Sequence, residues 1–209
     1  FPSQSSELIL SGPHLYMDRP FNKTPRSTCT LNSHYDCVDL LSIPNNYLPR
    51  TNYKPDVPRS EYLNRTPRVP WNENEQVTDY YRVCYRKMLN QASERTLICS
   101  LFPPGISHIN SVISAVFKEA NQAIDTCTLL SSICSDFFVK STGKSNLTSG
   151  DLALFPQEIS LSRPSAQLRT MILNCLTDHY SDLWEVFWTD TFRNHRWSKN
   201  DIRLDNNFF

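Results

Sequence analysis

The amino-acid sequence predicts an α+β fold, with a β-rich core, packed helices and a helical C-terminal extension. Ten of the 14 prolines lie in the first 70 residues. Because proline breaks helices and removes a backbone donor, this half should consist of short strands joined by long loops. The second half instead carries apolar residues at helical spacing. At 209 residues, one large domain with a small appendage is the expected organisation.

Composition narrows the class of protein without assigning a function. With 39% hydrophobic and 11% aromatic residues, the chain can build a sizeable core. Its 21 Lys and Arg balance 21 Asp and Glu, so it lacks the basic charge typical of nucleic-acid-binding domains. No apolar run approaches the roughly 18 residues of a membrane span. Residues 1–6 contain neither an initiator Met nor a signal region, so we expect a piece of a longer, cytoplasmic protein.

Two apolar runs and one long polar segment organise the first 70 residues. Glu7–Leu10 predicts a strand that ends at the turn signal Ser11-Gly12-Pro13. Val38–Ile43 is a second apolar run, closed by Pro44. From Pro49 to Pro70 almost nothing is periodic, so we expect an extended, polar, arginine-bearing loop.

The segment Tyr80–Leu89 alternates in a way that predicts a strand. A helix beginning at Gln76 also fits its apolar residues, and both readings place Arg82 and Arg86 on one face. The next run, Thr96–Phe102, is apolar and stops at two prolines. With a polar connector between them, the two runs read most simply as paired strands.

The second half is helical in character. Ala123–Val139 is apolar enough for a buried element, and Ser141–Gly150 reads as a loop. A further helix is expected to begin near Pro164. The apolar residues that predict helices form two sets: Ile109, Val112, Ile113, Val116, Phe117 and Ala120, then Leu168, Ile172, Leu176, Tyr180, Leu183 and Phe187.

Motifs for catalysis or metal binding are not recognisable in the sequence. The seven cysteines contain no C-x-x-C pair, so we expect reduced thiols packed as small hydrophobic residues. Gly143-Lys144-Ser145 resembles the end of a P-loop, but Phe138 stands where that motif requires glycine. A surface turn that exposes Lys140 and Lys144 is therefore the expected structure. The five histidines are scattered and form no known catalytic motif.

The densest basic region runs from Arg50 to Arg68, with five Lys or Arg against two acidic residues. Cations and amides interleaved with tyrosines, as at Asn52 and Tyr53, are groups that contact phosphates and base edges. A solvated loop whose arginines pair with local acids is the open alternative. Similarly, Arg82 and Arg86 could form a DNA-facing strip or an internal salt-bridge cluster.

A succession of short sequence words resembles one protein family. Tyr80–Arg86 followed by Glu94–Gly105 resembles a two-strand signature in the target-recognition region of large adenine-specific DNA methyltransferases from bacterial defence systems. These include the type IIG restriction–modification enzymes and related phage-defence methyltransferases. Further segments agree in the same order, with 130–140 similar to a helix and following strand of that region. They are Leu10–His14, Asn22–Pro25, Leu130–Lys140, Leu152–Pro156 and Leu173–Trp184.

The resemblance implies a parent enzyme that transfers a methyl group from S-adenosylmethionine to the 6-amino group of adenine. Its cofactor-binding and Asn-Pro-Pro-Tyr segments would lie upstream, so this piece itself should hold no cofactor and no catalytic residue. A fused restriction nuclease is also expected. The implied partners are double-stranded DNA and the catalytic domain of the same parent chain. Residues 1–163 would be the DNA target-recognition domain, and 164–209 a helical extension that begins the following region.

The candidate DNA contacts are cations, an amide and a phenol. They are Arg50, Asn52, Tyr53, Lys54, Arg65, Arg68, Arg82 and Arg86, with Lys140 and Lys144 as phosphate contacts. Arg95 is expected to be structural, because its neighbours are strand core. The alternative function is a protein-interaction or scaffold domain without DNA contact, which would dock a partner through the C-terminal tryptophans Trp184, Trp188 and Trp197.

Overall fold

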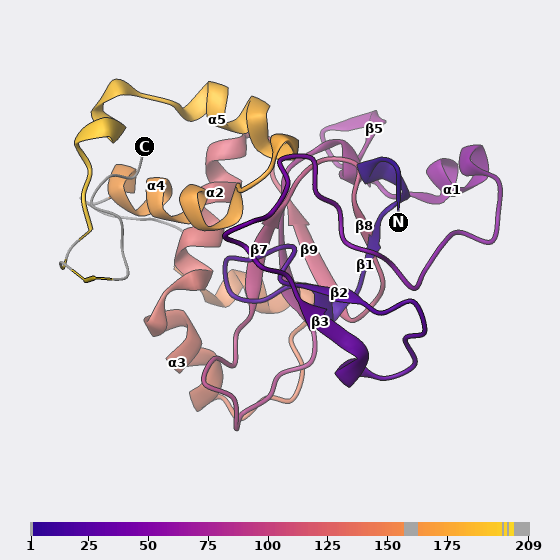
Figure 1. Ribbon diagram of the computed structural model, residues 1–209, viewed down its shortest axis with the longest axis horizontal. Helices are drawn as coiled ribbons and strands as arrows, with labels where there is room; N and C mark the ends of the chain where they lie inside the picture. Colours follow the sequence, from indigo (N-terminus) through magenta and orange to yellow (C-terminus); the bar gives the residue numbers. More distant parts are fainter. Residues whose placement is uncertain (1, 157–162, 198, 200, 203–209) are drawn as a thin grey trace.

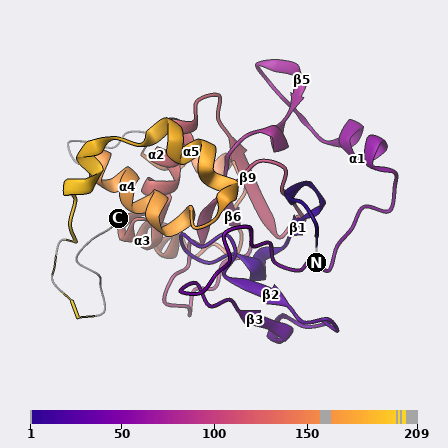
Figure 2. The same cartoon turned by 45° about the horizontal axis from the view of Figure 1, so that its top comes forward.

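The computed structural model describes residues 2–156, 163–197, 199, 201 and 202, and it confirms the α+β class. Short strands dominate the first half of the chain, and helices lie toward the C-terminus (Figure 1). The helices α2 (Ala120–Ser131), α4 (Arg163–Asn174) and α5 (Ser181–Phe187) gather on one side of the central sheet (Figures 1 and 2). The elements β1 (Ile9–Leu10), β2 (Lys23–Pro25) and α1 (Arg59–Arg65) lie toward the other side.

A three-stranded antiparallel sheet forms the centre of the molecule. Strand β6 (Arg82–Arg86) pairs with β7 (Cys99–Phe102) on one edge and with β9 (Val112–Val116) on the other. Tyr85 therefore lies opposite Cys99 in β7 and opposite Ile113 in β9. The predicted pair of strands is confirmed, and the helical alternative for the β6 segment is wrong.

Strand β9 corrects the prediction of a helix around Ile109–Ala120. Val112 and Val116 are four residues apart, and residues at that spacing share a face in a helix and in a strand alike. Its residues Val112, Ile113 and Val116 are β-branched, and they favour the extended pairing that β6 offers.

Outside the central sheet and α1 (Arg59–Arg65), the regular structure of the first half consists of short two-stranded sheets and 3-10 turns joined by loops, as its prolines predict. The paired strands are β1 (Ile9–Leu10) with β8 (Ser107–His108), which are parallel, and β2 (Lys23–Pro25) with β3 (Tyr35–Cys37) and β4 (Arg68–Val69) with β5 (Asn72–Gln76), which are antiparallel. The 3-10 turns of this half are η1 (Ser5–Glu7), η2 (Gly12–His14), η3 (Asn32–His34) and η4 (Val77–Asp79). Those of the second half are η5 (Ser149–Leu154), η6 (Asp178–Tyr180) and η7 (Asp190–Asn194).

Two segments of the first half differ from their predictions. The apolar run Val38–Ile43 lies outside any strand, and the side chain of Leu41 is fully exposed. The predicted loop between Pro49 and Pro70 contains a short helix, α1 (Arg59–Arg65). Pro58 precedes this helix, a position where its fixed φ and missing N–H cost nothing. None of the α1 residues is buried.

The helices of the second half are shorter than the periodic patterns predict. The buried element after Ala123 is two helices, α2 (Ala120–Ser131) and α3 (Ile133–Ser141), because Ser132 adopts an extended backbone between them. The Ser132 hydroxyl accepts a hydrogen bond from the backbone N–H of Ser135 at 3.1 Å, which caps α3. The strand expected within 130–140 is therefore wrong.

The C-terminal part begins with α4 (Arg163–Asn174), close to the predicted start at Pro164. The single predicted helix ends at Asn174, and a second helix, α5 (Ser181–Phe187), follows η6. Among the described residues, no helix is long and apolar enough to span a membrane.

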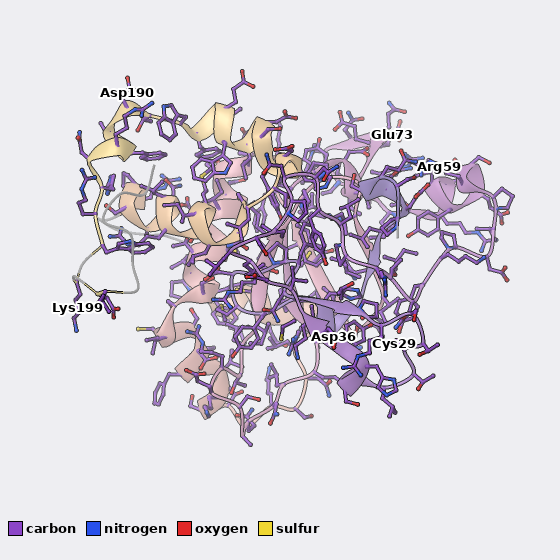
Figure 3. All side chains as sticks on the ribbon, in the orientation of Figure 1. Cys29, Asp36, Arg59, Glu73, Asp190 and Lys199 are labelled. Atoms are coloured by element: carbon purple, nitrogen blue, oxygen red, sulfur yellow. The ribbon has the colours of Figure 1, made fainter. Side chains whose placement is uncertain are left out.

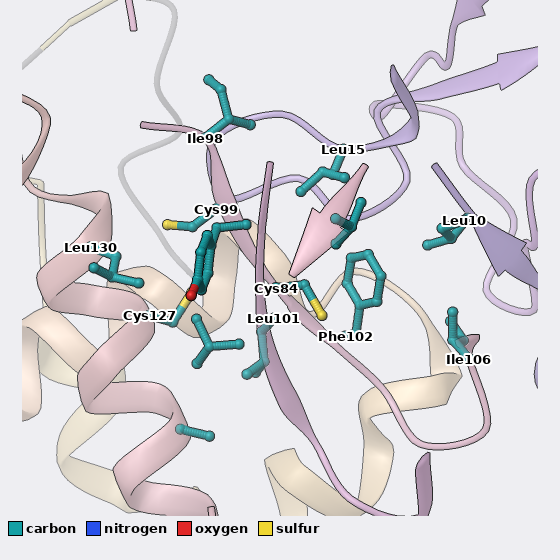
Figure 4. Packing of buried hydrophobic residues seen from close by; sticks show 14 of the residues in the cluster. Leu10, Leu15, Cys84, Ile98, Cys99, Leu101, Phe102, Ile106, Cys127 and Leu130 are labelled. Atoms are coloured by element: carbon teal, nitrogen blue, oxygen red, sulfur yellow. The ribbon is translucent and has the colours of Figure 1, made fainter. Parts of the chain in front are cut away.

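One hydrophobic core joins the sheet to the helices. Leu10, Leu101, Phe102 and Leu130 come from β1, β7 and α2 and pack together (Figure 4). Four of the seven free cysteines are buried among them, whereas Cys37 and Cys134 are exposed. Further members come from the C-terminal helices and η6: Met171, Tyr180 and Leu183. The predicted domain boundary at 163/164 thus lies within a segment whose two sides share one core.

Arg95 has the structural role that was expected. Its guanidinium donates to the backbone oxygen of Ser131 at 2.7 Å and lies 3.5 Å from the Asp136 carboxylate. The same carboxylate accepts hydrogen bonds from the N–H groups of Thr96 and Leu97, each at 2.8 Å. These contacts hold the connector before β7 against the junction of α2 and α3.

Candidate nucleic-acid interface

The basic segment that begins at Arg50 has a backbone fixed by three earlier parts of the chain. The Arg50 N–H donates to the Thr24 hydroxyl at 2.9 Å, and the Arg50 carbonyl accepts from Nε2 of His14 at 2.9 Å. One residue later, the Thr51 hydroxyl donates to the Ile9 carbonyl at 2.5 Å. Asn52 and Tyr53 therefore extend from an anchored backbone, although the segment lies outside any helix or strand.

His14 occupies one tautomer because of its partners. A carbonyl only accepts, so Nε2 carries the proton that is donated to Arg50. Nδ1 then accepts from the backbone N–H of Ser11 at 3.0 Å. The side chain is fully buried, and burial lowers its pKa from the ordinary value of 6.5. His14 is thus a neutral link between η2 and the basic segment.

Polar groups continue from His14 toward the surface. The hydroxyl groups of Ser11 and Tyr35 lie 3.0 Å apart, and the amide of Asn52 donates to the Tyr35 hydroxyl at 3.3 Å. The rings of His14 and Tyr35 meet edge to face, with centroids 5.1 Å apart. The network holds the Asn52 amide in one orientation, whereas the amide of a free surface asparagine would rotate.

Two cavities flank Asn52 and Tyr53, and both residues line both cavities. The first has a volume of about 560 Å³ and includes Lys23, Tyr35 and Arg86 in its walls. The second, of about 590 Å³, is lined by Lys54, Arg59 and Tyr62, with Glu7 among the opposing residues. We call Asn52–Lys54 the ridge. Amide, phenol and cationic groups converge there, and these are groups that recognise base edges and phosphates.

The cations of the basic segment differ in their partners. Lys54 and Arg59 are exposed, and among the described residues neither forms an ion pair. Arg65 pairs with Glu61 on α1, as the solvated-loop alternative expects, and Arg68 donates to the Asn74 carbonyl at 3.4 Å. The segment therefore contains both cations without an ion-pair partner among the described residues and cations that bind local partners. Figure 3 shows Arg59 near α1, at the opposite end of the molecule from Lys199.

The two arginines of β6 do not lie on an outer face. Arg82 is only 2% exposed, and its Nη2 donates to the Ile106 carbonyl. Arg86 is half buried and donates from Nε to the Gly12 carbonyl at 2.8 Å and from Nη2 to the Leu15 carbonyl at 2.5 Å. Neither forms the expected DNA-facing strip or the alternative salt-bridge cluster, because carbonyl oxygens of neighbouring segments hold the two guanidinium groups.

Lys140 and Lys144 lie at the end of α3, where they hold local structure. Lys140 donates to the Ser93 carbonyl at 3.1 Å, and Lys144 pairs with the carboxylate of Asp151. Gly143 between them adopts a φ of +64°, the left-handed conformation that commonly ends a helix. This turn follows a helix, whereas a P-loop follows a strand. Its neighbour, the 87–91 connector, contributes residues to the wall of the first cavity.

Sequence reasoning missed Ser11, Lys23 and Tyr35 as members of this site. The only signal for Ser11 and Lys23 was their position within the segments 10–14 and 22–25 of the family resemblance, and Tyr35 lies outside those segments. The structure places them beside Asn52 across 17 to 41 residues of chain. Within the described part of the chain, no group of three or more His, Cys, Asp or Glu gathers as a metal site.

Comparison with known proteins adds no relative: no family model, curated protein or solved structure matches the chain. Its function therefore has to be inferred from its own residues.

Proposed function

We propose that this chain is the sequence-specific DNA-recognition domain of an adenine-specific DNA methyltransferase that forms part of a restriction–modification or related phage-defence enzyme. The observation that carries the proposal is the ridge, which follows the backbone anchored at Arg50 and Thr51 and has a cavity on each side. Asn52 and Tyr53 line both cavities, and Lys54 lines the second. The ordered succession of family-like segments supports the same function.

The division of roles follows from the chemistry of the side chains. Asn52 can offer a donor and an acceptor together to an adenine edge in the major groove, and its link to Tyr35 holds it in place. Lys54 and Arg59 would neutralise backbone phosphates, which confer affinity without selecting sequence. Methyl transfer itself would occur in the catalytic domain of the parent chain, where S-adenosylmethionine would bind.

The net charge of zero is compatible with this role when the charge is divided along the chain. Residues 111–209 carry nine Lys or Arg against 11 Asp or Glu, whereas Arg50–Arg68 carries five against two. A recognition domain needs one basic surface, and the catalytic domain would share the neutralisation of phosphates. We therefore expect the isolated chain to bind duplex DNA weakly and in a salt-sensitive way.

The charge on the second cavity provides the first test. The double variant Lys54→Glu/Arg59→Glu should weaken duplex binding, measured by fluorescence anisotropy at low ionic strength. Its plot of log K against log salt concentration should be shallower by about 2, since each lost phosphate contact removes close to one unit of slope. Arg193→Glu/Lys199→Glu makes the same change of charge at the other end of the molecule and should leave both quantities near wild type.

Base reading is tested separately. Asn52→Ala should reduce discrimination between preferred and other duplexes by about 1–3 kcal/mol without changing the salt slope. The parent enzyme supplies the readout of sequence preference. Absence of duplex binding by both the chain and its parent at low ionic strength would refute the DNA function, as would equal losses in the ridge and control variants.

A protein-interaction role is the second candidate, and the surface of α3 favours it. Ile133 is 76% exposed and Phe137, one helical turn later, is 71% exposed. Large apolar side chains gathered on a helix face are typical of contact surfaces. By contrast, Trp184 donates its indole N–H to the Cys175 carbonyl at 3.0 Å, so it is held by the fold. Loss of a partner contact in Phe137→Ser with unchanged DNA binding would favour this role.

A further inference from the structure

The guanidinium of Arg82 is a buried charge without a matching acid. Its side chain is 2% exposed, and Nε has no hydrogen-bond partner. Ion pairs among the described residues involve other cations, and the partner of Arg82 is the neutral carbonyl of Ile106. Cys84, Tyr62 and Asp79 lie within electrostatic range, but the Asp79 carboxylate accepts from the backbone N–H of Gln76.

Arg82 lines a third cavity, which adjoins the second and shares Pro55, Val57 and Tyr62 with it. The cavity has a volume of about 620 Å³ and lies between the 55–67 segment, η4, β6, β8 and β9. Its polar lining includes His108, Ser114 and Thr66, with Arg65 and Asp56 contributed by the 55–67 segment. Arg65 is paired with Glu61, and Asp56 is the acidic residue in the wall.

His108 has a defined hydrogen-bonding state in this cavity. Its Nδ1–H donates to the Ile109 carbonyl at 3.1 Å, since a carbonyl only accepts. Nε2 lies 2.8 Å from the Ser114 hydroxyl, which donates to it when the ring is neutral and accepts from it when the ring is protonated. Burial lowers the pKa of His108 below 6.5, and the positive charge of Arg82 lowers it further. An anion in the cavity would reverse this second effect.

The unpaired buried charge of Arg82 indicates that the cavity lacks a negatively charged group near the guanidinium. A buried guanidinium that meets only neutral oxygen atoms has lost its water without gaining a counter-charge. Guanidinium groups match the oxygen atoms of phosphate in geometry and charge. A volume of about 620 Å³ also leaves room for more than a bare phosphate ion, and apolar atoms in the walls would contact the rest of the ligand.

We propose that this third cavity binds a phosphate group, with Arg82 as its charge partner and His108 as a second donor once it is protonated. The inference can be tested separately from the proposed DNA-recognition function, because the wall of this cavity contains neither the ridge residues nor Arg59. The phosphate has two sources with the same chemistry, a free phosphate-bearing molecule such as a nucleotide and the backbone of bound DNA.

The first experiment uses the unmodified chain and inorganic phosphate. NMR titration of the histidine side chains is carried out with phosphate and with sodium chloride at equal ionic strength. Phosphate should raise the pKa of His108 by about 1 or more, because a nearby anion stabilises the imidazolium. The Arg82 Nε–H signal should shift in the same titration. Identical His108 behaviour in the two salts would overturn the proposal.

Variants locate the site. His108→Gln should weaken phosphate binding by a few-fold, and Arg82→Lys by about tenfold or more, because lysine keeps the charge but loses the planar fork. Arg68→Gln removes an exposed guanidinium outside the cavity wall and serves as the matched control. If Arg82→Lys does not fold, His108→Gln alone decides the outcome. Unchanged phosphate affinity in His108→Gln and in every folded Arg82 variant would place the anion elsewhere and overturn the proposal.

A competition measurement distinguishes the two sources. A short duplex that removes the phosphate-induced change at His108 identifies the ligand as a DNA backbone phosphate. Independent binding of phosphate and duplex identifies a free phosphate-bearing molecule. Both results support a phosphate site in the third cavity. If the ridge variants do not alter DNA binding, the result for this cavity is unaffected.

Discussion

Buried polar residues connect segments of this protein that are far apart in sequence. Asp18 has a positive φ of 56°, and its carboxylate accepts hydrogen bonds from Ser131 of α2 and from Asn174 of α4. Burial raises the pKa of Asp18 above its ordinary value, against the opposing effect of these hydrogen bonds. His14 connects η2 to the basic segment at Arg50 in a similar way. Both residues tie local backbone conformation to tertiary contacts.

The buried His14 gives a prediction for the pH dependence of stability. Because its pKa is lowered in the folded state, the unfolded chain takes up a proton below about pH 6.5 that the folded chain does not. The free energy of unfolding should therefore fall as the pH decreases from 6.5 toward the folded-state pKa, and urea denaturation at several pH values measures it. The lowered pKa of His108 acts in the same direction, and Asp18 acts oppositely above pH 3.8.

The variant His14→Gln isolates the His14 contribution, since the other groups remain. Its stability should decrease less steeply between pH 6.5 and pH 5 than that of the wild type. Parallel curves for the two proteins would contradict the predicted role of His14.

At the scale of elements, side chains complete the outer edge of β7. This strand lies at the edge of the central sheet, so alternate backbone groups have no strand partner. Asn174 Oδ1 accepts from the Leu101 N–H at 2.8 Å, and the Tyr180 hydroxyl donates to the Leu101 carbonyl at 2.7 Å. The Asp18 N–H donates to the Cys99 carbonyl at 2.9 Å. The C-terminal elements thus protect the sheet from pairing with another chain.

Asn174→Ala should destabilise the protein by about 2–4 kcal/mol. The change leaves the Leu101 N–H without its acceptor and removes a donor from the buried Asp18 carboxylate. Asn146, an exposed asparagine in the turn after α3, provides a matched control, and Asn146→Ala should change stability by about 0.5 kcal/mol or less. Chemical denaturation measures both variants, and equal effects would contradict the edge-completing role of Asn174.

At the scale of the molecule, α4 and α5 belong to the same core as the central sheet. Leu168, Met171, Tyr180 and Leu183 are each at most 2% exposed. Residues of α1 line the second and third cavities, whereas α4 and α5 lie on the other side of the central sheet (Figures 1 and 2). The C-terminal region therefore packs against the scaffold that carries the ridge.

A chain that ends at Pro156 should lose cooperative unfolding. Loss of each large buried side chain costs about 2–5 kcal/mol, and four such losses approach or exceed the 5–15 kcal/mol that is typical of whole domains. Thermal unfolding followed by circular dichroism tests this. A cooperative transition in the shortened chain would instead support the domain boundary at 163/164 that the sequence predicts.

Some features could be predicted from sequence because local chemistry determines them. The β6–β7 pair follows from two apolar runs bounded by polar and proline-rich segments, and the start of α4 follows from Pro164. Strand β9 could not be distinguished from a helix, because Val112 and Val116 share a face in both. For the candidate site, sequence identified the basic segment and Asn52, whereas Tyr35 and Lys23 depended on folding.

By itself, the sequence determined the α+β class, the short strands of the proline-rich half and the concentration of cations between Arg50 and Arg68. Only the tertiary structure decided which cations remain at the surface. Arg82 and Arg86 share a face of β6, but burial depends on what packs over that face. The segments that contain Gly12, Leu15 and Ile106 cover it. Residue spacing determines toward which face of a sheet each side chain of a strand points. Its exposure and electrostatic environment depend on contacts with segments that are distant in sequence.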